Sequence, residues 1–125
     1  MASPQKTCPA MEGLSEQALT QVAQYFSALA EPTRLRILNC LRDREQNVGE
    51  LAEICECSQA NVSRHLSTLA KHGLVAREGR GTSVYYRIAD PSIYALCDLV
   101  CGNVARQLEA QAAVLGGLKS AGKDS

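Results

Sequence analysis

The fold is decided by residues 48–75, which read VGELAEICECSQANVSRHLSTLAKHGLV. The pattern predicts a short helix over Val48 to Cys55, a tight turn, and a second helix that is capped by Ser58 and ends at Gly73. Apolar residues at positions i, i+4 and i+7 of the second helix predict the face that packs on a core. These residues are Val62, Leu66 and Leu69.

The flanking segments predict the elements that complete the domain. They are a first helix over Ser15 to about Ala30, a second beginning at Pro32, strands over Val75–Glu78 and Ser83–Ile88 joined through Gly79, Arg80 and Gly81, and a last helix from Asp90 and Pro91 to about Leu115. Two short helices followed by a hairpin are typical of a winged helix-turn-helix, whose second helix enters the DNA major groove. The expected fold is therefore mainly α with a small β-hairpin wing.

Length and composition agree with one helical domain that folds without a metal or disulfide frame. The chain has 125 residues, of which 46% are hydrophobic and only 4% aromatic, so Leu, Val, Ile and Ala are expected to form the core. We expect this domain over residues 15–115. Residues 1–14, which lack helical periodicity, are expected to be a flexible arm, and residues 116–125 a flexible tail.

Charge and hydropathy exclude several classes of protein. The net charge is zero, which argues against a protein that coats nucleic acid or membrane through bulk charge, but residues 58–87 carry five basic side chains against Glu78 alone, or +4. A local phosphate-binding surface is one interpretation, and a solvated charged face is the other. No apolar run approaches the roughly 18 residues of a membrane span, so we expect a cytoplasmic protein without a membrane partner. No nucleophile with a paired base, phosphate-binding loop or carboxylate pair is visible, so an enzyme is not expected.

The polar side chains of the second helix and the wing are the candidate DNA contacts. They are Ser58, Gln59, Asn61, Ser63, Arg64, His65, Ser67, Thr68, Lys71 and Arg80. Gln and Asn can pair with adenine and Arg with guanine, whereas Ser and Thr mostly hold phosphates. Arg80, at the expected hairpin tip, could enter a minor groove. His65 is as consistent with packing as with a phosphate contact, and an amphipathic surface helix is the alternative for the whole set.

Five motifs together resemble the arsenic-repressor (ArsR/SmtB) family. They are AEPTRLRIL at 30–38, VGEL at 48–51, SQANVSRHL at 58–66, HGLV at 72–75 and VYYRI at 84–88. The resemblance covers roughly residues 15 to 115. It implies a homodimer whose first and last helices form the interface, and a repressor that an inducer releases from double-stranded operator DNA.

Two inducer sites of that family do not match this sequence. The soft-metal site implied on the third helix needs cysteines at positions that resemble Asn47, Gly49 and Ala52. The zinc-type site needs histidines on the last helix, and none occurs between Asp90 and Leu115. Zinc, nickel or cobalt sensing through that helix is therefore not expected.

Thiol chemistry remains, because the chain has six cysteines. Cys97 and Cys101 are four residues apart on the predicted last helix, so both sulfurs can share one soft ion, and Cys8 on the arm could complete the trigonal sulfur set that As(III) or Sb(III) favours. The alternative is that Cys97 and Cys101 are small apolar residues of a dimer interface. Weaker candidates for the inducer site are Cys55, Cys57 and Cys40.

Thiol oxidation or persulfidation is the second class of inducer. Cysteines one helical turn apart have Cβ atoms about 5–6 Å apart, beyond the roughly 3.5–4.5 Å of an unstrained disulfide. A direct disulfide between Cys97 and Cys101 would therefore strain the helix, whereas a bridging metalloid would not. Metalloid release is the leading hypothesis and redox or persulfide sensing the alternative.

Overall fold

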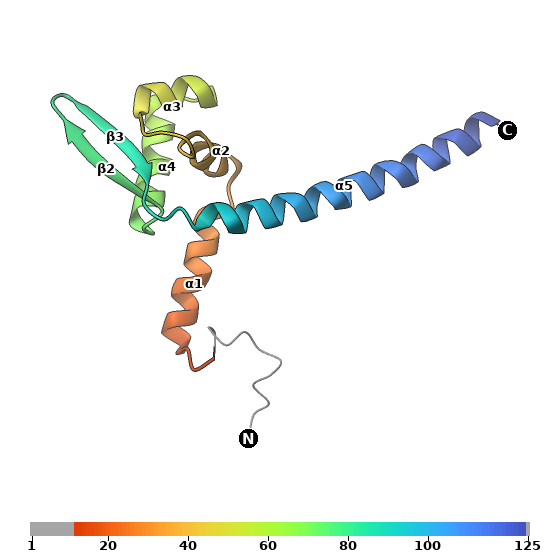
Figure 1. Cartoon of the computed structure of the whole chain (residues 1–125), viewed down its shortest axis with the longest axis horizontal. Helices are drawn as coiled ribbons and strands as arrows, with labels where there is room; N and C mark the ends of the chain where they lie inside the picture. Colours follow the sequence, from red (N-terminus) through yellow and green to blue (C-terminus); the bar gives the residue numbers. More distant parts are fainter. Residues whose placement is uncertain (1–11, 125) are drawn as a thin grey trace. The chain divides into compact units, whose positions relative to one another are not determined.

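The computed structural model describes residues 12–124, with side chains described to residue 117 (Figure 1). The elements in chain order are α1 (Glu16–Leu29), α2 (Pro32–Cys40), β1 (Gln46–Asn47), α3 (Val48–Cys55), α4 (Gln59–Lys71), β2 (Val75–Arg80), β3 (Ser83–Ile88) and α5 (Ile93–Asp124). They form two compact units that divide at Ala89, so the helical and strand unit before it and the unit containing α5 are described separately.

The sheet contains one strand that the sequence did not predict. Among the described residues it has three antiparallel strands in the order β1-β3-β2, with Val75 opposite Ile88 and Arg80 opposite Ser83. Strand β1 is only two residues long, too short to show the alternation by which strands are recognised in sequence. Strand β2 also continues to Arg80 instead of ending at Glu78, so the hairpin turn is shorter than predicted.

An aliphatic core confirms the expectation from composition. The fully buried side chains are Ile37, Leu38, Leu51, Val62, Leu66, Leu69 and Leu74. The predicted core face of α4 is confirmed, because its three apolar residues at helical spacing are all in this set. Helices α2, α3 and α4 thus bury one apolar stripe each.

Local capping interactions set the helix boundaries around the turn between α3 and α4. Asn47 and Glu50 form a capping box at the start of α3, with each side chain accepting a bond from the other residue's backbone N–H at 2.8 and 2.9 Å. Ser58 caps α4 by accepting the N–H of Asn61 at 3.1 Å. Between the helices, Glu56 adopts the left-handed conformation with φ 54° and ends α3.

The last helix differs from its predicted bounds at both ends. Asp90 accepts bonds from the backbone and hydroxyl of Ser92, which forms a turn, and α5 begins only at Ile93. The helix then continues to Asp124, beyond the predicted end at Leu115, because no proline follows to stop it and adding residues to a formed helix costs little.

No helix in the described part of the chain is long and apolar enough to span a membrane.

Candidate DNA-binding surface and cysteine sites

Helix α4 presents a polar face whose side chains can hydrogen-bond to DNA. The exposed members of the predicted set are Ser58, Gln59, Arg64, Ser67 and Lys71, and the half-buried ones are Asn61, Ser63 and Thr68. The Arg64 guanidinium donates to the Asn61 side-chain oxygen, so these two side chains are held together. Arg and amide side chains offer the donors and acceptors that pair with base edges in the major groove.

His65 is the one predicted DNA contact on α4 that the structure places on the buried face. Its residue is only 4% exposed and lies on the helix side that also carries Val62 and Leu69. The prediction of a DNA contact is wrong for this residue. It was based on polarity, whereas the helical position of residue 65, three after Val62, turns it toward the core.

Arg34 of α2 explains how a histidine is accommodated there. Its guanidinium donates to the carbonyl oxygens of Ala28 at 2.6 Å and Ser27 at 3.3 Å, at the C-terminal end of α1, and lies 3.3 Å from Nδ1 of His65. The Glu31 carboxylate lies 3.7 Å from Nε2 of the same ring. Through these contacts one arginine connects α1, α2 and α4. Its position at the C-terminal end of α1 is stabilising, because a cation there interacts favourably with the helix dipole.

Burial and these neighbours change the titration of both groups. Burial lowers the pKa of His65, and the cations Arg64 and Arg34 lower it further, while Glu31 opposes them. The hydrogen bond from the Arg34 backbone lowers the pKa of Glu31. The neutral imidazole and the carboxylate are therefore the favoured forms.

Arg80 of the wing lies at the end of β2 and is held by acidic neighbours, not extended from the hairpin tip. It donates two bonds to the Glu45 carboxylate, one of them at 2.8 Å, and contacts Glu78 at 3.4 Å. Its guanidinium carbon lies 5.0 Å from the centre of the Tyr85 ring. Hydrogen bonds to Glu45 and Glu78 raise the pKa of Arg80. In this conformation the side chain is engaged within the protein.

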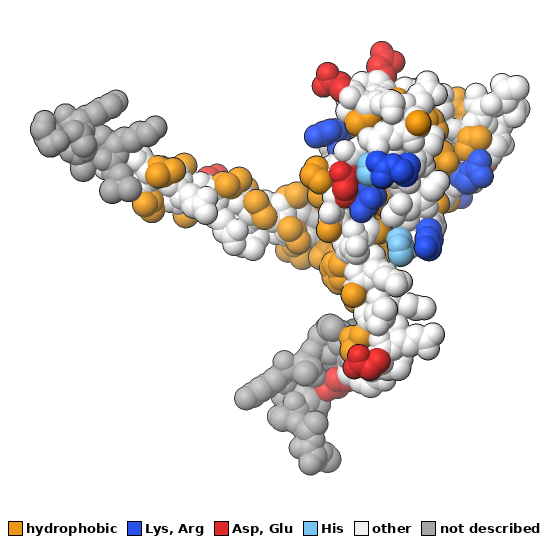
Figure 2. Space-filling view, turned by 180° about the vertical axis from the view of Figure 1, so that it is seen from behind, with side chains coloured by type: hydrophobic (Ala, Val, Ile, Leu, Met, Phe, Trp, Pro, Cys, Tyr) orange, Lys and Arg blue, Asp and Glu red, His pale blue; other side chains and the backbone are white. Residues whose placement is uncertain are grey.

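Part of the positive charge of residues 58–87 is therefore engaged in ion pairs within the protein. Besides Arg80, Arg87 also contacts Glu78, at 3.7 Å. Lys71 and Arg77 are exposed and form no ion pair within the described residues. Figure 2 shows Lys and Arg side chains on the helical and strand unit, with acidic side chains close to some of them. The cations available to phosphates are therefore fewer than the sequence count.

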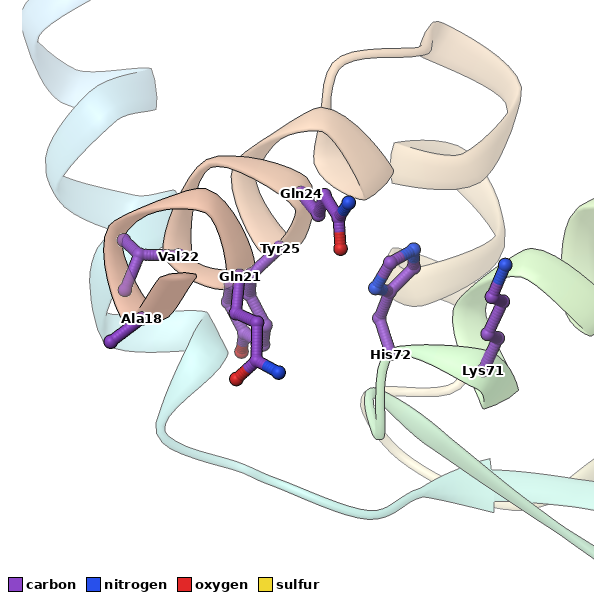
Figure 3. Close-up of a pocket in the computed structure, with 7 residues that line it drawn as sticks. All are labelled: Ala18, Gln21, Val22, Gln24, Tyr25, Lys71 and His72. Carbon is purple, nitrogen blue, oxygen red and sulfur yellow. The ribbon is translucent and has the colours of Figure 1, made fainter. Parts of the chain in front are cut away.

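A shallow hollow of about 600 Å³ lies between α1 and the end of α4 (Figure 3). Gln21, Gln24 and Tyr25 line one side, and Lys71 and His72 line the other. Small-molecule sites usually enclose most of their ligand, and this hollow is open to solvent. The hollow is therefore a surface depression beside the polar face of α4 and does not have the enclosed shape of a small-molecule site.

Cys97 and Cys101 both lie on α5, one helical turn apart, as predicted. Cys97 is half-buried and Cys101 exposed. Cys8, the predicted third ligand, lies outside the described residues. Within residues 12–124 no cluster of three or more His, Cys, Asp or Glu side chains is arranged to hold a metal ion. The described part of the α5 site is therefore a pair of thiols.

The three weaker cysteine candidates occur where α2 and α3 end. Cys40 is the last residue of α2 and Cys55 the last of α3. Cys57 donates its thiol hydrogen to the Cys55 carbonyl at 3.3 Å. Burial, followed by the neighbouring Cys40, raises the pKa of the Cys55 thiol to about 11.

Comparisons with known proteins agree with this architecture. A helix-turn-helix domain family model matches residues 29–78, from the end of α1 to β2. The HTH-type transcriptional regulator Rv0081 of Mycobacterium tuberculosis is 36% identical over 109 residues, which cover 86% of this chain and 96% of the relative. Its crystal structure has a TM-score of 0.70 at 34% identity and covers 78% of this chain and 99% of Rv0081.

The family follows from these relatives and the motifs. The chain belongs to the ArsR/SmtB family of winged helix-turn-helix transcriptional regulators. This ArsR/SmtB protein is accordingly a regulator and not an enzyme.

Two further structures of ArsR/SmtB-like proteins bear on assembly and inducer. The homodimeric winged helix-turn-helix DNA-binding domain of Mb0332 from Mycobacterium bovis has a TM-score of 0.67 at 35% identity, covering 79% of this chain and 94% of that domain. The AntR antimony-specific transcriptional repressor has a TM-score of 0.66 at 25% identity, covering 87% of this chain and 99% of AntR.

The sequence did not indicate which residues would contact His65 and Arg80. Arg34 and Glu31 lie 31 and 34 positions before His65, and no local pattern indicates that they meet. The same holds for Glu45 and Arg80, which are 35 positions apart. A family alignment that retained Arg34 together with His65 would have been the signal.

Proposed function

We propose that this chain is a homodimeric repressor that leaves its operator when Sb(III) or As(III) binds the thiols of Cys97 and Cys101. The observation that carries the proposal is that these two thiols lie one turn apart on α5, the helix with the most exposed apolar surface. An ion bound there would act on the same helix that a partner subunit would cover.

Exposed apolar side chains support the dimer. On α5 they include Leu99, which is 73% exposed, and Leu108, which is 59% exposed. Figure 2 shows hydrophobic side chains along the described length of this helix. On α1, Phe26 is 52% exposed. Monomeric proteins rarely leave large contiguous apolar surfaces in water, and the Mb0332 domain is homodimeric.

The polar face of α4 supports operator binding. In a two-fold dimer both copies of α4 would meet major grooves one helical turn apart, so the operator should be an inverted repeat. Gln59 and Arg64 are the proposed base contacts, while Ser58, Ser67 and Lys71 are proposed to hold phosphates. Each of these five residues is exposed.

Sulfur softness and spacing support the inducer. Thiolates are the ligands that thiophilic ions prefer, and two residues four apart on a helix face the same side. Cys8 is the proposed third ligand. AntR, which is similar in structure, is an antimony-specific repressor. Inducer binding would favour a form of the dimer that fits DNA poorly.

The test is fluorescence anisotropy with the full chain and a labelled DNA fragment from upstream of its own gene, at fixed salt. The fragment should bind far more tightly than a shuffled sequence, and antimonite or arsenite should release it. Zinc should have no effect. Release by a persulfide donor or peroxide, with none by either metalloid, would overturn the inducer and favour thiol redox sensing.

A further inference from the structure

Helix α4 carries one polar side chain on a buried face that is otherwise aliphatic. Val62, Leu66 and Leu69 are fully buried, and His65 on the same side of the helix is 4% exposed. Apolar contacts are non-directional, so on their own they specify the rotation of a helix about its axis only loosely. A buried hydrogen bond is directional and selects one orientation. His65 is therefore the residue through which the orientation of α4 can be fixed.

Both ring nitrogens of His65 face charged groups at the start of α2. The Arg34 Nη1 lies 3.3 Å from Nδ1, and the Glu31 carboxylate lies 3.7 Å from Nε2. The backbone N–H of Arg34 donates to the same carboxylate oxygen at 2.9 Å, so these two groups are fixed relative to each other. The imidazole is thus held from two sides by residues of one helical turn.

The Arg34 guanidinium is itself anchored at the end of α1. Its Nε donates to the carbonyl oxygen of Ala28 at 2.6 Å, and its Nη2 donates to that of Ser27 at 3.3 Å. Nearer its start, α1 borders the open hollow whose other side is the end of α4 (Figure 3). Because an open hollow supplies no packing, the orientation of α4 relative to α1 depends more strongly on the bridge that Arg34 makes.

A small rotation of α4 would misplace the side chains that are proposed to read DNA. Arg64 directly precedes His65, Gln59 is the first residue of the helix, and both are exposed. Side chains reach about 5–6 Å from a helix axis, so a rotation of about 20° moves their ends by about 2 Å. Hydrogen bonds to bases tolerate only roughly half an ångström. Base contacts would be lost, whereas a long, flexible side chain such as Lys71 can still follow a phosphate.

We propose that Arg34 and His65 are positioning residues for operator recognition, whose contact fixes the rotation of α4 and so determines how strongly the protein prefers its operator over other DNA. Both residues act through Arg64 and Gln59. The inference rests on the proposed function, because it assumes that α4 reads the operator. This role in sequence discrimination is separate from the phosphate contacts that supply non-specific affinity.

Conservative and disruptive variants separate this contact from the general stability of the fold. His65→Leu removes the acceptor, whereas His65→Asn supplies an amide oxygen close to the place of Nδ1 and should restore it. Arg34→Lys keeps a cation at the end of α1 but lacks the planar fork that reaches the carbonyls and the ring together. Arg36→Lys, at an exposed position of the same helix, is the matched control.

Fluorescence anisotropy at fixed salt measures the affinity of the full chain for a fragment from upstream of its own gene and for a shuffled sequence. His65→Leu and Arg34→Lys should each lower the ratio of the two affinities about tenfold, while binding to the shuffled sequence stays within about twofold of the parent. His65→Asn and Arg36→Lys should keep the parent ratio. Circular dichroism and size-exclusion chromatography check that each variant folds and keeps the oligomeric state of the parent.

A role in stability alone would lower both affinities together and leave their ratio unchanged. The parent ratio in folded Arg34→Lys would therefore overturn the proposal, and this variant keeps the test decisive if His65→Leu does not fold. A lowered ratio in Arg36→Lys would also overturn it, because that side chain makes no part of the contact.

The double variant Arg34→Lys/His65→Leu tests whether the two residues act through one contact. If they do, the second substitution removes nothing further, and the ratio falls about tenfold, as in each single variant, instead of about a hundredfold. A hundredfold loss would show two independent effects and contradict the proposed contact. A parent that binds its upstream fragment no more tightly than the shuffled sequence would disprove the proposed function, and the positioning role with it. Discrimination by the parent that every variant retains would disprove the positioning role alone.

Discussion

The Arg34 guanidinium of α2 lies 3.3 Å from Nδ1 of His65 on the buried face of α4. Because arginine stays protonated and only donates, we assign Nδ1 as the acceptor and place the ring proton on Nε2, which faces Glu31 at 3.7 Å. A second proton on this ring would bring an N–H toward the guanidinium. Helix α4 is therefore linked to α2 through a neutral histidine.

We predict that the protein loses stability as the pH falls below about 6.5. Burial lowers the pKa of His65 in the folded state, so the unfolded chain, with an ordinary pKa near 6.5, binds more protons in this window. Stability is full above pH 6.5 and falls as the pH approaches the folded pKa. Urea unfolding at a series of pH values from 8 to 5.5 measures the effect.

The matched variants for this prediction are His65→Gln and His72→Gln. The first should flatten the pH dependence between 6.5 and 5.5, although it can also lower stability at all pH values. The second leaves the buried histidine in place and should keep the parent profile. Equal flattening by both would contradict the assignment to His65. The pKa of Glu31 is also lowered in the folded state, so its contribution to stability is lost only as the pH falls below 4.5 and does not affect this range.

Substituting the exposed polar residues of α4 should weaken DNA binding without unfolding the protein. Arg64→Ala and Gln59→Ala should each cost about 1–3 kcal/mol in operator affinity, equivalent to roughly 5- to 150-fold, because each removes one base contact. Glu53→Ala, on an exposed position of α3, is the control and should change affinity little. Parent-like affinity in both α4 variants at the same salt would show that this helix does not read the operator.

Because Arg80 is paired with Glu45, we predict that substituting either residue changes DNA affinity differently. If the acid holds the arginine away from DNA, Glu45→Gln should raise affinity and steepen the salt dependence by about one unit, since one more phosphate contact forms. Arg80→Ala alone should change affinity little. The double variant Glu45→Gln/Arg80→Ala separates a released arginine from the simple loss of a negative charge. A large loss of affinity in Arg80→Ala would mean that the side chain leaves Glu45 on binding DNA.

Cys97→Ser and Cys101→Ser should each bind the operator but no longer release it with antimonite or arsenite. A serine hydroxyl is a poor ligand for a soft ion, so either change removes one of the two thiols that share it. Cys8→Ser should weaken the response less if it only completes the site. Anisotropy titration with metalloid measures release. Normal release from the double variant Cys97→Ser/Cys101→Ser would contradict the α5 site and make Cys55 and Cys57 the next candidates.

Local physics made much of this protein predictable. The winged helix-turn-helix is predictable because its caps, its helical spacing and the left-handed Gly73 that follows α4 act within a few residues. Val62, Leu66 and Leu69 were placed in the core for the same reason, since the helical period alone selects the buried stripe. The pair of thiols on α5 follows from that period too.

Contacts between distant residues were decided only by the tertiary structure. The helical period places His65 on the buried side of α4, but only the tertiary structure brings Arg34 to its ring. The fold also brings Glu45 beside Arg80, although the two residues are 35 positions apart in the sequence. Sequence periodicity fixes which side of a helix is buried. It carries no information on which charge or thiol of another element will lie opposite, because that depends on how the elements pack.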